Sequence, residues 1–556
     1  MNNSNITCER KKFKPILPNI LQNRIKNIDP VSCCSTYSEN PKIQQRFINT
    51  YGKPVIKFRK GLNTHNIQKK SMKVAVIFSG GQAPGGHNVI AGIFDCLKKV
   101  NPENRLIGYL GGAAGILKNQ YKIIEKDQLK HYRNTGGFHL IYSGRDKIET
   151  VEQLSLMKKH FETDKVDALI IIGGDDSNTN AAIIAEYFKQ KKLKTCIVGV
   201  PKTIDGDLQN QYVEIPFGFD TATKIYSELV GNVCIDVCSA RKYWHFIRLM
   251  GRSASHITLE VGLQTHPNII VIGEEVLEKR MTLSNIVDNI IDIILKRSKL
   301  NKDFGVILIP EGLIEFIPEI RELIYTINDI LYKNRDIIKT MKTCVEKEHY
   351  ICSKLPSHLY NLMQSFPHNI IEQLLLDRDP HGNIQVSSIE TDKLLITMIH
   401  KKLNKLCKLG KYHGKFNAIS HFFGYEGRCG LPSNFDANYA YALGYNAAVL
   451  IINGFTGYLS YINKLAKVPY DWECGGVPIV NMINIEKRKG EDKFVIQKTL
   501  VDLHGIPFME YISNKEKWAL NEDYISPGPI QYYGKSCITD RVTKTLQLKC
   551  KKPKKI

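Results

Sequence analysis

The sequence predicts an α/β protein with two doubly wound parallel-sheet (Rossmann-like) domains, a helical insertion and an N-terminal extension. Short apolar runs such as residues 73–78 and 167–173 are typical of buried parallel strands. Segments with helical spacing alternate with these runs, which is the pattern of a sheet covered by helices. From about residue 318 to 417, apolar residues recur at helical spacing without such runs. We therefore expect α/β domains interrupted by a stretch of helices.

The same patterns divide the chain into five expected parts. The beginning is polar and weakly periodic, so we expect an extension with at most one edge strand, at residues 54–58. The end is polar and basic, which is typical of a solvated tail. The expected parts are an N-terminal extension (1–71), a first α/β domain (72–225 with about 425–475), a second α/β domain (226–317 with about 476–530), the helical insertion (318–417) and a basic tail (531–556).

Composition and charge narrow the class of partners. The chain has 556 residues, of which 43% are hydrophobic and 24% charged, as in a globular protein with more than one domain. Its formal net charge of +22 favours anionic partners such as phosphorylated metabolites, nucleic acid or a membrane surface. The basic residues are spread through linkers, insertion and tail, whereas nucleic-acid-binding proteins concentrate them on one face beside aromatic side chains. We therefore expect neither nucleic acid nor a membrane as a partner.

The cysteines and the start of the chain predict a reduced, cytoplasmic protein. Fourteen cysteines are present without a Cys-x-x-Cys pair, so neither a zinc site nor a redox motif is predicted. Unpatterned cysteines in a large chain are typical of a reducing compartment. The first 30 residues lack the apolar core of a signal peptide, and no run approaches the ~18 apolar residues of a membrane span.

A glycine-rich loop follows the first strand of the body. The strand at 73–78 leads into Ser-Gly-Gly-Gln-Ala-Pro-Gly-Gly-His-Asn at 79–88, and residues 89–99 have helical character. In such an arrangement backbone N–H groups approach an anion, and the helix start adds about half a positive charge. The spacing matches neither the dinucleotide fingerprint nor the common P-loop. The loop is therefore either a phosphate cradle or a tight strand-to-helix turn.

Two consecutive strands further along each end in a loop with two carboxylates. Residues 167–173 lead to Asp175 and Asp176, and the next strand leads to Asp205 and Asp207. In an open α/β sheet such loops meet at the carboxyl edge, where ligands bind. Gly-Asp and Asp-Gly pairs are also ordinary turn chemistry, so either loop alone could be only a turn. Together they predict a hydrated Mg²⁺ that holds a polyphosphate, with one carboxylate left to act as a base.

Charged residues also follow other strands. Arg145 lies in a small-residue loop, where it either reaches a phosphate or is only solvated. Arg252 lies in a loop at the end of a strand of mixed polar and apolar residues. Glu311 comes directly after an apolar strand, and Tyr-Glu-Gly-Arg at 425–428 follows another strand. All of these positions are at the ends of strands, where an α/β protein places its ligand-binding groups.

Taken in order, these loops resemble the motifs of the phosphofructokinases, and in particular their long, diphosphate-dependent form. The resemblance spans roughly residues 70–530, and it is specific because the motifs occur together in one order. They are Gly-Gly-Gln-Ala-Pro-Gly at 80–85, Gly-Gly-Asp-Asp-Ser at 173–177, Pro-Lys-Thr-Ile-Asp-Gly-Asp at 201–207, Met-Gly-Arg at 250–252, Pro-Glu-Gly-Leu at 310–313 and Tyr-Glu-Gly-Arg at 425–428.

The resemblance implies reversible transfer of a phosphoryl group from diphosphate to the 1-hydroxyl of fructose 6-phosphate. It implies that Gly81 holds the donor phosphate, that Asp175 carries Mg²⁺ and that Asp205 takes the hydroxyl proton. The first α/β domain would bind diphosphate and the second fructose 6-phosphate. ATP-using relatives have glycine where Asp176 stands, and Lys202 can neutralise the leaving phosphate. Both residues therefore favour diphosphate over ATP.

The sugar site follows from the same resemblance. Arg252 and Glu311 would contact the sugar, and the guanidinium fork of Arg428 would hold its 6-phosphate. Lys242 and Tyr243 fall where the family reaches across from a neighbouring subunit, which implies a homodimer or a larger homo-oligomer. The implied substrate-binding residues are Thr203, Ile204, Asp205, Lys242, Tyr243, Met250, Gly251, Arg252, Glu311, Tyr425, Glu426, Gly427 and Arg428.

Two related functions stay open at this point. An ATP-dependent phosphofructokinase would carry out the same transfer with another donor. A regulatory subunit would bind substrates without catalysis, and we would expect it to lack the base or the metal carboxylate. Asp175, Asp205 and Asp207 are all present, which favours the enzyme.

Overall fold

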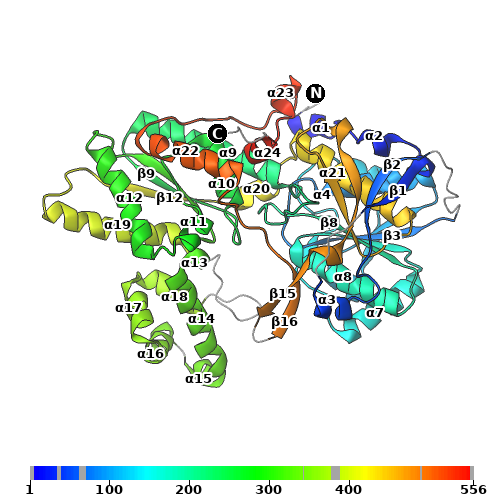
Figure 1. Cartoon of the computed structure of the whole chain (residues 1–556), viewed down its shortest axis with the longest axis horizontal. Helices are drawn as coiled ribbons and strands as arrows, with labels where there is room; N and C mark the ends of the chain where they lie inside the picture. The colour runs from blue at the N-terminus through cyan, green and yellow to red at the C-terminus, as the bar shows by residue number, and fades with distance from the viewer. Residues whose placement is uncertain are drawn as a thin grey trace. The chain divides into compact units, whose positions relative to one another are not determined.

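The computed structural model describes residues 5–33, 39–61, 70–341, 343–376, 389–488 and 491–550 (Figure 1). The chain forms two compact units. Unit 1 comprises Met1–Ile225, Tyr425–Thr499 and Ile530–Cys550, and unit 2 comprises Tyr226–Gly424 and Leu500–Pro529. The lysine-rich end of the expected basic tail, residues 551–556, lies outside the described residues.

Unit 1 is built on a sheet whose centre is parallel and whose ends are antiparallel. Strands β7 and β8 in the middle are apolar and buried along their whole length, as expected where helices cover both faces. The order of strands across the sheet is β1 (Ile28–Cys33), β2 (Val55–Lys60), β14 (Glu473–Pro478), β13 (Tyr458–Asn463), β8 (Cys196–Pro201), β7 (Ala168–Gly173), β3 (Lys73–Ser79), β4 (Arg105–Tyr109) and β5 (Tyr121–Ile123), with β6 (Ser143–Gly144) paired to β3.

Two helices of unit 1, α4 (Gly86–Val100) and α21 (Asn434–Ile452), pack backbone against backbone. A Cβ atom added at Gly92 would lie 2.1 Å from the carbonyl oxygen of Tyr441, and one at Gly444 would lie 2.0 Å from that of Val89. Only residues without a side chain allow this approach. The other helices of unit 1 are α1 (Ile6–Arg10), α2 (Asn19–Gln22), α3 (Pro41–Arg46), α5 (Ala113–Leu117), α6 (Lys126–Lys130), α7 (Val151–Asp164), α8 (Asp175–Gln190), α20 (Tyr425–Arg428), α23 (Ser536–Thr539) and α24 (Lys544–Lys549).

The beginning of the chain contributes strands to this sheet. The sequence suggested one edge strand at residues 54–58, but β2 pairs with β1 on one side and with β14 on the other. The expectation of an edge strand is therefore wrong. The reason lies in its side chains: Ile56 and Phe58 are buried, while Lys57 between them forms an ion pair with Glu473 on β14. A strand with a lysine among apolar residues can pair on both edges when the lysine finds an acidic partner on the next strand.

Unit 2 contains an all-parallel sheet and the helical insertion. The sheet order is β10 (Ile269–Ile270), β11 (Gly305–Pro310), β9 (Trp244–Leu249) and β12 (Ala418–Phe423). Side chains from this sheet and from the insertion form one buried apolar cluster, which includes Trp244, Ile307, Leu323 and Leu395. The helices of unit 2 are α10 (His256–Thr265), α11 (Gly273–Glu278), α12 (Leu283–Ser298), α13 (Leu313–Phe316), α14 (Pro318–Lys333), α15 (Arg335–Thr340), α16 (Cys344–Lys354), α17 (Ser357–Ser365), α18 (His368–Leu376), α19 (Thr391–Lys408) and α22 (Ile506–Leu520), and α9 (Phe219–Ala240) contains the boundary between the units.

The compact units divide the chain differently from the expected domains at residues 476–499. The sequence assigned these residues to the second α/β domain, whereas the structure places them in unit 1. Strand β14 pairs with β13 and β2, and the hairpin of β15 (Ile483–Arg488) and β16 (Glu491–Ile496) packs on α8. Strand β14 ends at Pro478 because the chain turns into a 3₁₀ helix at Ile479–Met482. The hairpin is a two-stranded sheet of its own, so its residue types do not indicate which unit it packs on.

The described cysteines are all free thiols, and several are buried. Burial raises the pKa of the Cys196 thiol to about 11, so this side chain packs as a small apolar group. Among the helices that the structure describes, none combines the length and the apolar character that a membrane crossing requires.

Candidate active site

The glycine loop and the two acidic loops follow neighbouring strands of unit 1. Strand β7 lies between β3 and β8, and the three run parallel, so their loops emerge at one edge. Direct hydrogen bonds join the loops. The Ser177 hydroxyl donates to the Ser79 hydroxyl at 2.8 Å, and the Lys202 N–H donates to the Gly173 carbonyl at 2.9 Å. The structure thus brings together the loops that the sequence expected to meet.

Two cationic side chains lie against the glycine loop. A Cβ atom added at Gly80, whose φ is +86°, would lie 3.3 Å from the Lys202 ammonium nitrogen. One added at Gly81 would lie 2.9 Å from a guanidinium nitrogen of Arg428. Because Gly80 and Gly81 have no side chains, their backbone stays accessible beside the cations of Lys202 and Arg428. This arrangement is suited to binding a phosphate.

Lys202 is a buried cation. Its residue is only 5% exposed, and burial lowers the pKa of its ammonium to about 8 from an ordinary value of 10.5. The carboxylate of Asp205 favours the charged form, and the guanidinium of Arg428 opposes it. Because the pKa lies near neutral pH, the charge of Lys202 depends on which anion occupies the loop.

The acidic side of the site contains a lysine that the sequence did not point to. The Lys498 ammonium lies 3.6 Å from Asp207 Oδ2 and 4.0 Å from Asp175 Oδ2. Burial raises the pKa of the Asp175 carboxyl, and the nearby Asp176 and Asp207 add to this effect while Lys498 opposes it. Asp175 is also the first residue of α8, where the helix dipole favours a negative charge.

Asp176 forms an ion pair of its own. Its Oδ1 accepts a hydrogen bond from the Lys147 ammonium at 3.0 Å, and its side chain is 54% exposed. Lys147 follows β6 in the same loop as Arg145, and the Arg145 side chain is exposed. The carboxylate expected to exclude ATP is thus held at the start of α8 by a neighbouring loop.

The candidate base lies in a tight turn. The Asp205 N–H donates to the Thr203 hydroxyl at 3.0 Å, and the Ile204 side chain between them is buried. Gly206 has a φ of +74°, a conformation that glycine adopts readily, and it lets the chain reverse between Asp205 and Asp207. The turn therefore separates the carboxylate of Asp205 from that of Asp207, which is 5% exposed.

The residues at 425–428 form the short helix α20 in unit 1. Arg428 donates a hydrogen bond to Gln82 of the glycine loop, and its guanidinium carbon lies 5.1 Å from the centre of the Tyr425 ring. Tyr425 and Glu426 are exposed, and Gly427 is buried. In this structure Arg428 lies beside the predicted donor-phosphate loop, a position that sequence reasoning did not foresee.

Unit 2 holds four further predicted residues at the carboxyl ends of β9 and β11: Met250, Gly251, Arg252 and Glu311. Glu311 is 4% exposed, and its Oε2 accepts a hydrogen bond from the Gly251 N–H at 3.0 Å. Gly251 has a φ of +129°, and a Cβ added at Gly312 would lie 1.8 Å from the Arg252 carbonyl oxygen. Met250 pairs with the adjacent strand through a hydrogen bond from its N–H to the Phe423 carbonyl at 3.0 Å. The Arg252 side chain is exposed.

Lys242 and Tyr243 lie apart from this group. They precede β9 at its amino end, whereas Met250, Gly251 and Arg252 follow its carboxyl end. Both are exposed, Tyr243 by 37%. The structure therefore does not place them with the other residues of unit 2 that were expected to contact the sugar.

The carboxylates of unit 1 fit a hard divalent cation that binds together with phosphate. Within the described ranges, no group of three or more His, Cys, Asp or Glu side chains is arranged as a complete metal site. Mg²⁺ commonly takes only one or two protein carboxylates and completes its shell with water and substrate phosphate. Asp175 and Asp207 both lie near the Lys498 ammonium, and the Asp207 charge reaches the Asp175 carboxyl, so the two can supply such a pair.

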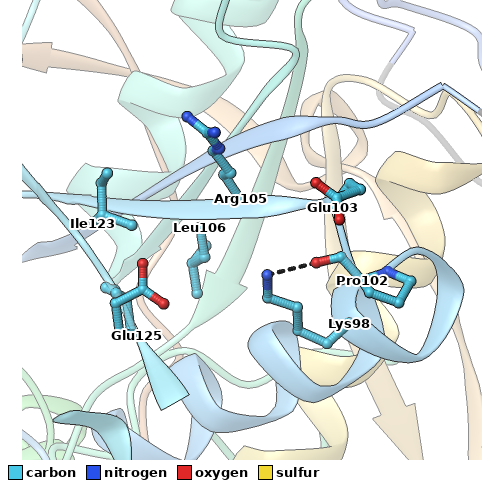
Figure 2. A pocket seen from close by; sticks show the side chains of 8 residues that line it. Lys98, Pro102, Glu103, Arg105, Leu106, Ile123 and Glu125 are labelled. Atoms are coloured by element: carbon cyan, nitrogen blue, oxygen red, sulfur yellow. Dashed lines mark hydrogen bonds between the residues drawn. The ribbon is translucent and has the colours of Figure 1, made fainter. Parts of the chain in front are cut away.

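A pocket of about 260 Å³ lies elsewhere in unit 1, beside β4 and β5 (Figure 2). Lys98, Glu103, Arg105 and Glu125 line it, and the Lys98 ammonium donates to the Pro102 carbonyl at 2.8 Å. Its lining includes none of the residues predicted for phosphate transfer. The pocket is therefore separate from the candidate active site.

Comparison with known proteins identifies the family of the chain. Residues 73–451 match the family description "Phosphofructokinase". The chain is 48% identical to pyrophosphate–fructose 6-phosphate 1-phosphotransferase subunit beta 2 of Arabidopsis thaliana, over 93% of this chain and 89% of that protein. It is 46% identical to pyrophosphate–fructose 6-phosphate 1-phosphotransferase of Porphyromonas gingivalis, over 99% of both chains.

A solved structure supports the fold. The pyrophosphate-dependent phosphofructokinase of Nitrosospira multiformis aligns with a TM-score of 0.54 at 15% identity, covering 88% of this chain and 99% of that one. The predicted α/β fold is thereby confirmed. With the fold, the ordered loops and full-length relatives in agreement, the chain belongs to the phosphofructokinase family.

Proposed function

We propose that this protein reversibly transfers a phosphoryl group from diphosphate to the 1-hydroxyl of fructose 6-phosphate, giving fructose 1,6-bisphosphate and phosphate. The observation that carries the proposal is the buried ammonium of Lys202, which lies against Gly80 at one end of its loop while Asp205 stands three residues later. A cation for the donor phosphate and a base for the acceptor hydroxyl thus come from one loop. Phosphoryl transfer needs this kind of positioning and charge neutralisation.

The predicted site residues of unit 1 then have distinct roles. Asp205 accepts the proton of the 1-hydroxyl, and Thr203 and Ile204 line the acceptor position beside it. Lys202 neutralises the charge that develops on the leaving phosphate, and backbone N–H groups around Gly81 orient the donor.

The family generally uses a divalent metal, and we propose Mg²⁺ held by Asp175. When bound, the metal supplies neutralisation of the diphosphate charge. The donor set of hard carboxylate oxygens fits this ion, as argued above from Asp175 and Asp207.

In unit 2 we propose that Glu311 and Arg252 bind the sugar. Glu311 is buried and already tied to the Gly251 N–H, so its second oxygen has a defined direction. Lys242 and Tyr243, at the other end of β9, are proposed to serve the site of a neighbouring subunit in a homodimer or larger homo-oligomer. Relatives from plants are named as subunits, which supports an oligomer. We also propose that the protein works in the cytoplasm, in glycolysis.

The donor is proposed to be diphosphate because Asp176 carries a negative charge at the start of α8, beside the expected position of the phosphates. A carboxylate there repels the additional phosphate of a nucleotide. The full-length relatives reported above are named for pyrophosphate, which supports the same choice.

The test is the initial rate with fructose 6-phosphate and Mg²⁺, with diphosphate compared against ATP. We expect a rate with diphosphate alone, and a loss of roughly 10²–10⁴-fold in Asp205→Asn, which removes the base. A rate with ATP alone would make the protein an ATP-dependent phosphofructokinase. No rate with either donor in a folded protein would favour a regulatory subunit.

A further inference from the structure

Lys498 lies where a metal ion would have to bind. Its ammonium is 3.6 Å from Asp207 Oδ2 and 4.0 Å from Asp175 Oδ2, and its side chain is 37% exposed. Neither distance is a close hydrogen bond, so the ammonium stands between the two carboxylates and favours neither strongly. This is the geometry of a counter-ion shared by two acids.

The chain holds Lys498 in place from both sides. Before it, the Ile496 N–H at the end of β16 donates to the Thr179 hydroxyl on α8 at 3.1 Å. After it, the Thr499 N–H donates to the Asp207 carbonyl at 2.8 Å, and the Thr499 hydroxyl donates to the Gln209 carbonyl. The segment is thus attached to the helix that begins with Asp175 and to the loop that contains Asp207. The lysine is positioned by the fold and is not an incidental surface contact.

The charges of this region explain why a cation is useful there. The carboxylates of Asp175 and Asp207 both lie within 4.0 Å of the Lys498 ammonium, and Asp176 is the residue after Asp175 on α8. A divalent ion at the same oxygens would face the ammonium at short range and would have to displace it. The displaced ammonium would then need an anion, and diphosphate provides one.

We propose that Lys498 competes with the divalent cation for Asp175 and Asp207, so that the metal enters the site with diphosphate and not alone. This inference rests on the proposed function, because it takes Asp175 as the metal ligand. A metal ion that binds without diphosphate must displace the Lys498 ammonium from the two carboxylates, and no diphosphate is then present to pair with that ammonium. With diphosphate present, the ammonium transfers from the carboxylates to phosphate oxygens, and the metal takes its place. Lys498 thereby couples metal binding to donor binding.

The test measures Mn²⁺ binding to the full chain without sugar or turnover, from the electron paramagnetic resonance signal of free Mn²⁺. Lys498→Met is compared with the charge-retaining Lys498→Arg. A second neutral variant, Lys498→Gln, guards against a folding defect in the first. Lys158→Met is the matched control, since the Lys158 side chain is 31% exposed and forms an ion pair with Glu162 at 3.7 Å on α7. Asp175→Asn tests the metal ligand itself.

We expect both neutral variants to bind Mn²⁺ alone about tenfold more tightly than the unmodified protein, since removing the competitor leaves the acids free for the metal. Lys498→Arg and Lys158→Met should bind as the unmodified protein does. Addition of the unreactive analogue imidodiphosphate should tighten Mn²⁺ binding strongly in the unmodified protein and much less in the neutral variants.

Three results would overturn the inference. Unchanged or weaker Mn²⁺ binding in the neutral variants would show that Lys498 does not compete with the metal. Equal tightening in Lys498→Arg would show that charge is not the cause. Unchanged Mn²⁺ binding in Asp175→Asn would show that Asp175 is not a metal ligand. The inference depends on that ligand and would fail with it. Loss of binding in Asp175→Asn together with unchanged neutral variants would leave the proposed function intact and reject only the competition.

Discussion

Lys202 shows how burial of one side chain adjusts a site to its substrate. Burial removes the ammonium from water and destabilises its charged form, and the carboxylate of Asp205 offsets part of this destabilisation. A phosphate that binds beside Lys202 stabilises the charged form further. The residue is therefore poised to be fully charged when the donor is bound and only partly charged when it is absent.

A pH profile tests this role. The charged form of Lys202 is the active one, and its pKa of about 8 lies below the ordinary value, so activity should fall as pH rises through about 8. We expect kcat/KM for diphosphate to show this fall, because that ratio reports the free enzyme. Lys202→Arg keeps its charge and should stay flat over the same range. Ionisation of diphosphate affects both proteins equally, so identical profiles would contradict the assignment.

Asp176 gives a prediction about the donor. Asp176→Gly removes the carboxylate that opposes a nucleotide phosphate, and we expect kcat/KM for ATP to rise by at least about tenfold. Donor competition assays would measure the change. The control is Lys147→Met, which removes the ion pair but leaves the carboxylate. ATP use by the control and not by Asp176→Gly would mean that Lys147, and not Asp176, excludes the nucleotide.

At the scale of elements, the buried strands were the most predictable part of the molecule. Residues 74–78 and 168–173 are apolar without interruption, because both faces of β3 and β7 are covered, and such runs are visible in sequence. The loops that follow them were predictable too, since strand order places their ends together. For β2, in contrast, a lysine in the middle concealed an interior strand.

Lys498 could not have been predicted, and the reason is physical. It is separated from Asp207 by almost three hundred residues, and its effect depends on where the hairpin of β15 and β16 docks. The docking relies on hydrogen bonds donated by the Ile496 and Thr499 N–H groups, and every residue except proline carries such a donor. The contact of Arg428 with Gln82 was missed for a similar reason, since the resemblance assigned Arg428 to the sugar.

The contact between α4 and α21 yields a stability prediction. In Gly444→Ala the new methyl group would lie 2.0 Å from the Val89 carbonyl, so the helices must separate. We expect the free energy of unfolding to fall by about 1–3 kcal/mol, as for other overpacked cores, and to outweigh the gain in helix propensity. Urea denaturation of the variant measures this. An unchanged or raised midpoint would mean that the two helices can move apart at no cost.

At the scale of the whole molecule, the positions of Lys242 and Tyr243 raise the question of how many chains build one active site. Both are exposed at the amino end of β9, away from Arg252 and Glu311 in the same unit. If they serve a neighbouring chain, no single chain contains a complete site.

Mixing two inactive variants tests this arrangement. Asp205→Asn and Lys242→Ala should each be inactive or strongly impaired alone. After exchange of subunits in an equal mixture, some dimers would combine both lesions in one site and leave the other intact, which should restore about a quarter of the full rate. Activity in the mixture that merely averages the two parents would show that each chain builds its own site.

The order of strands in unit 1 also governs how the protein can be made. Strand β8 pairs with β13, with Val198 opposite Tyr458, so its partner is translated some 260 residues later. During synthesis on the ribosome the edge of β8 therefore stays unpaired for on the order of tens of seconds at ordinary synthesis rates. A chain truncated after residue 225 should therefore sediment with aggregates when expressed, and a soluble fragment would contradict this. Chaperones bind apolar strand edges that stay unpaired for this long. We therefore expect the yield of folded enzyme to depend on the amount of chaperone in the cell.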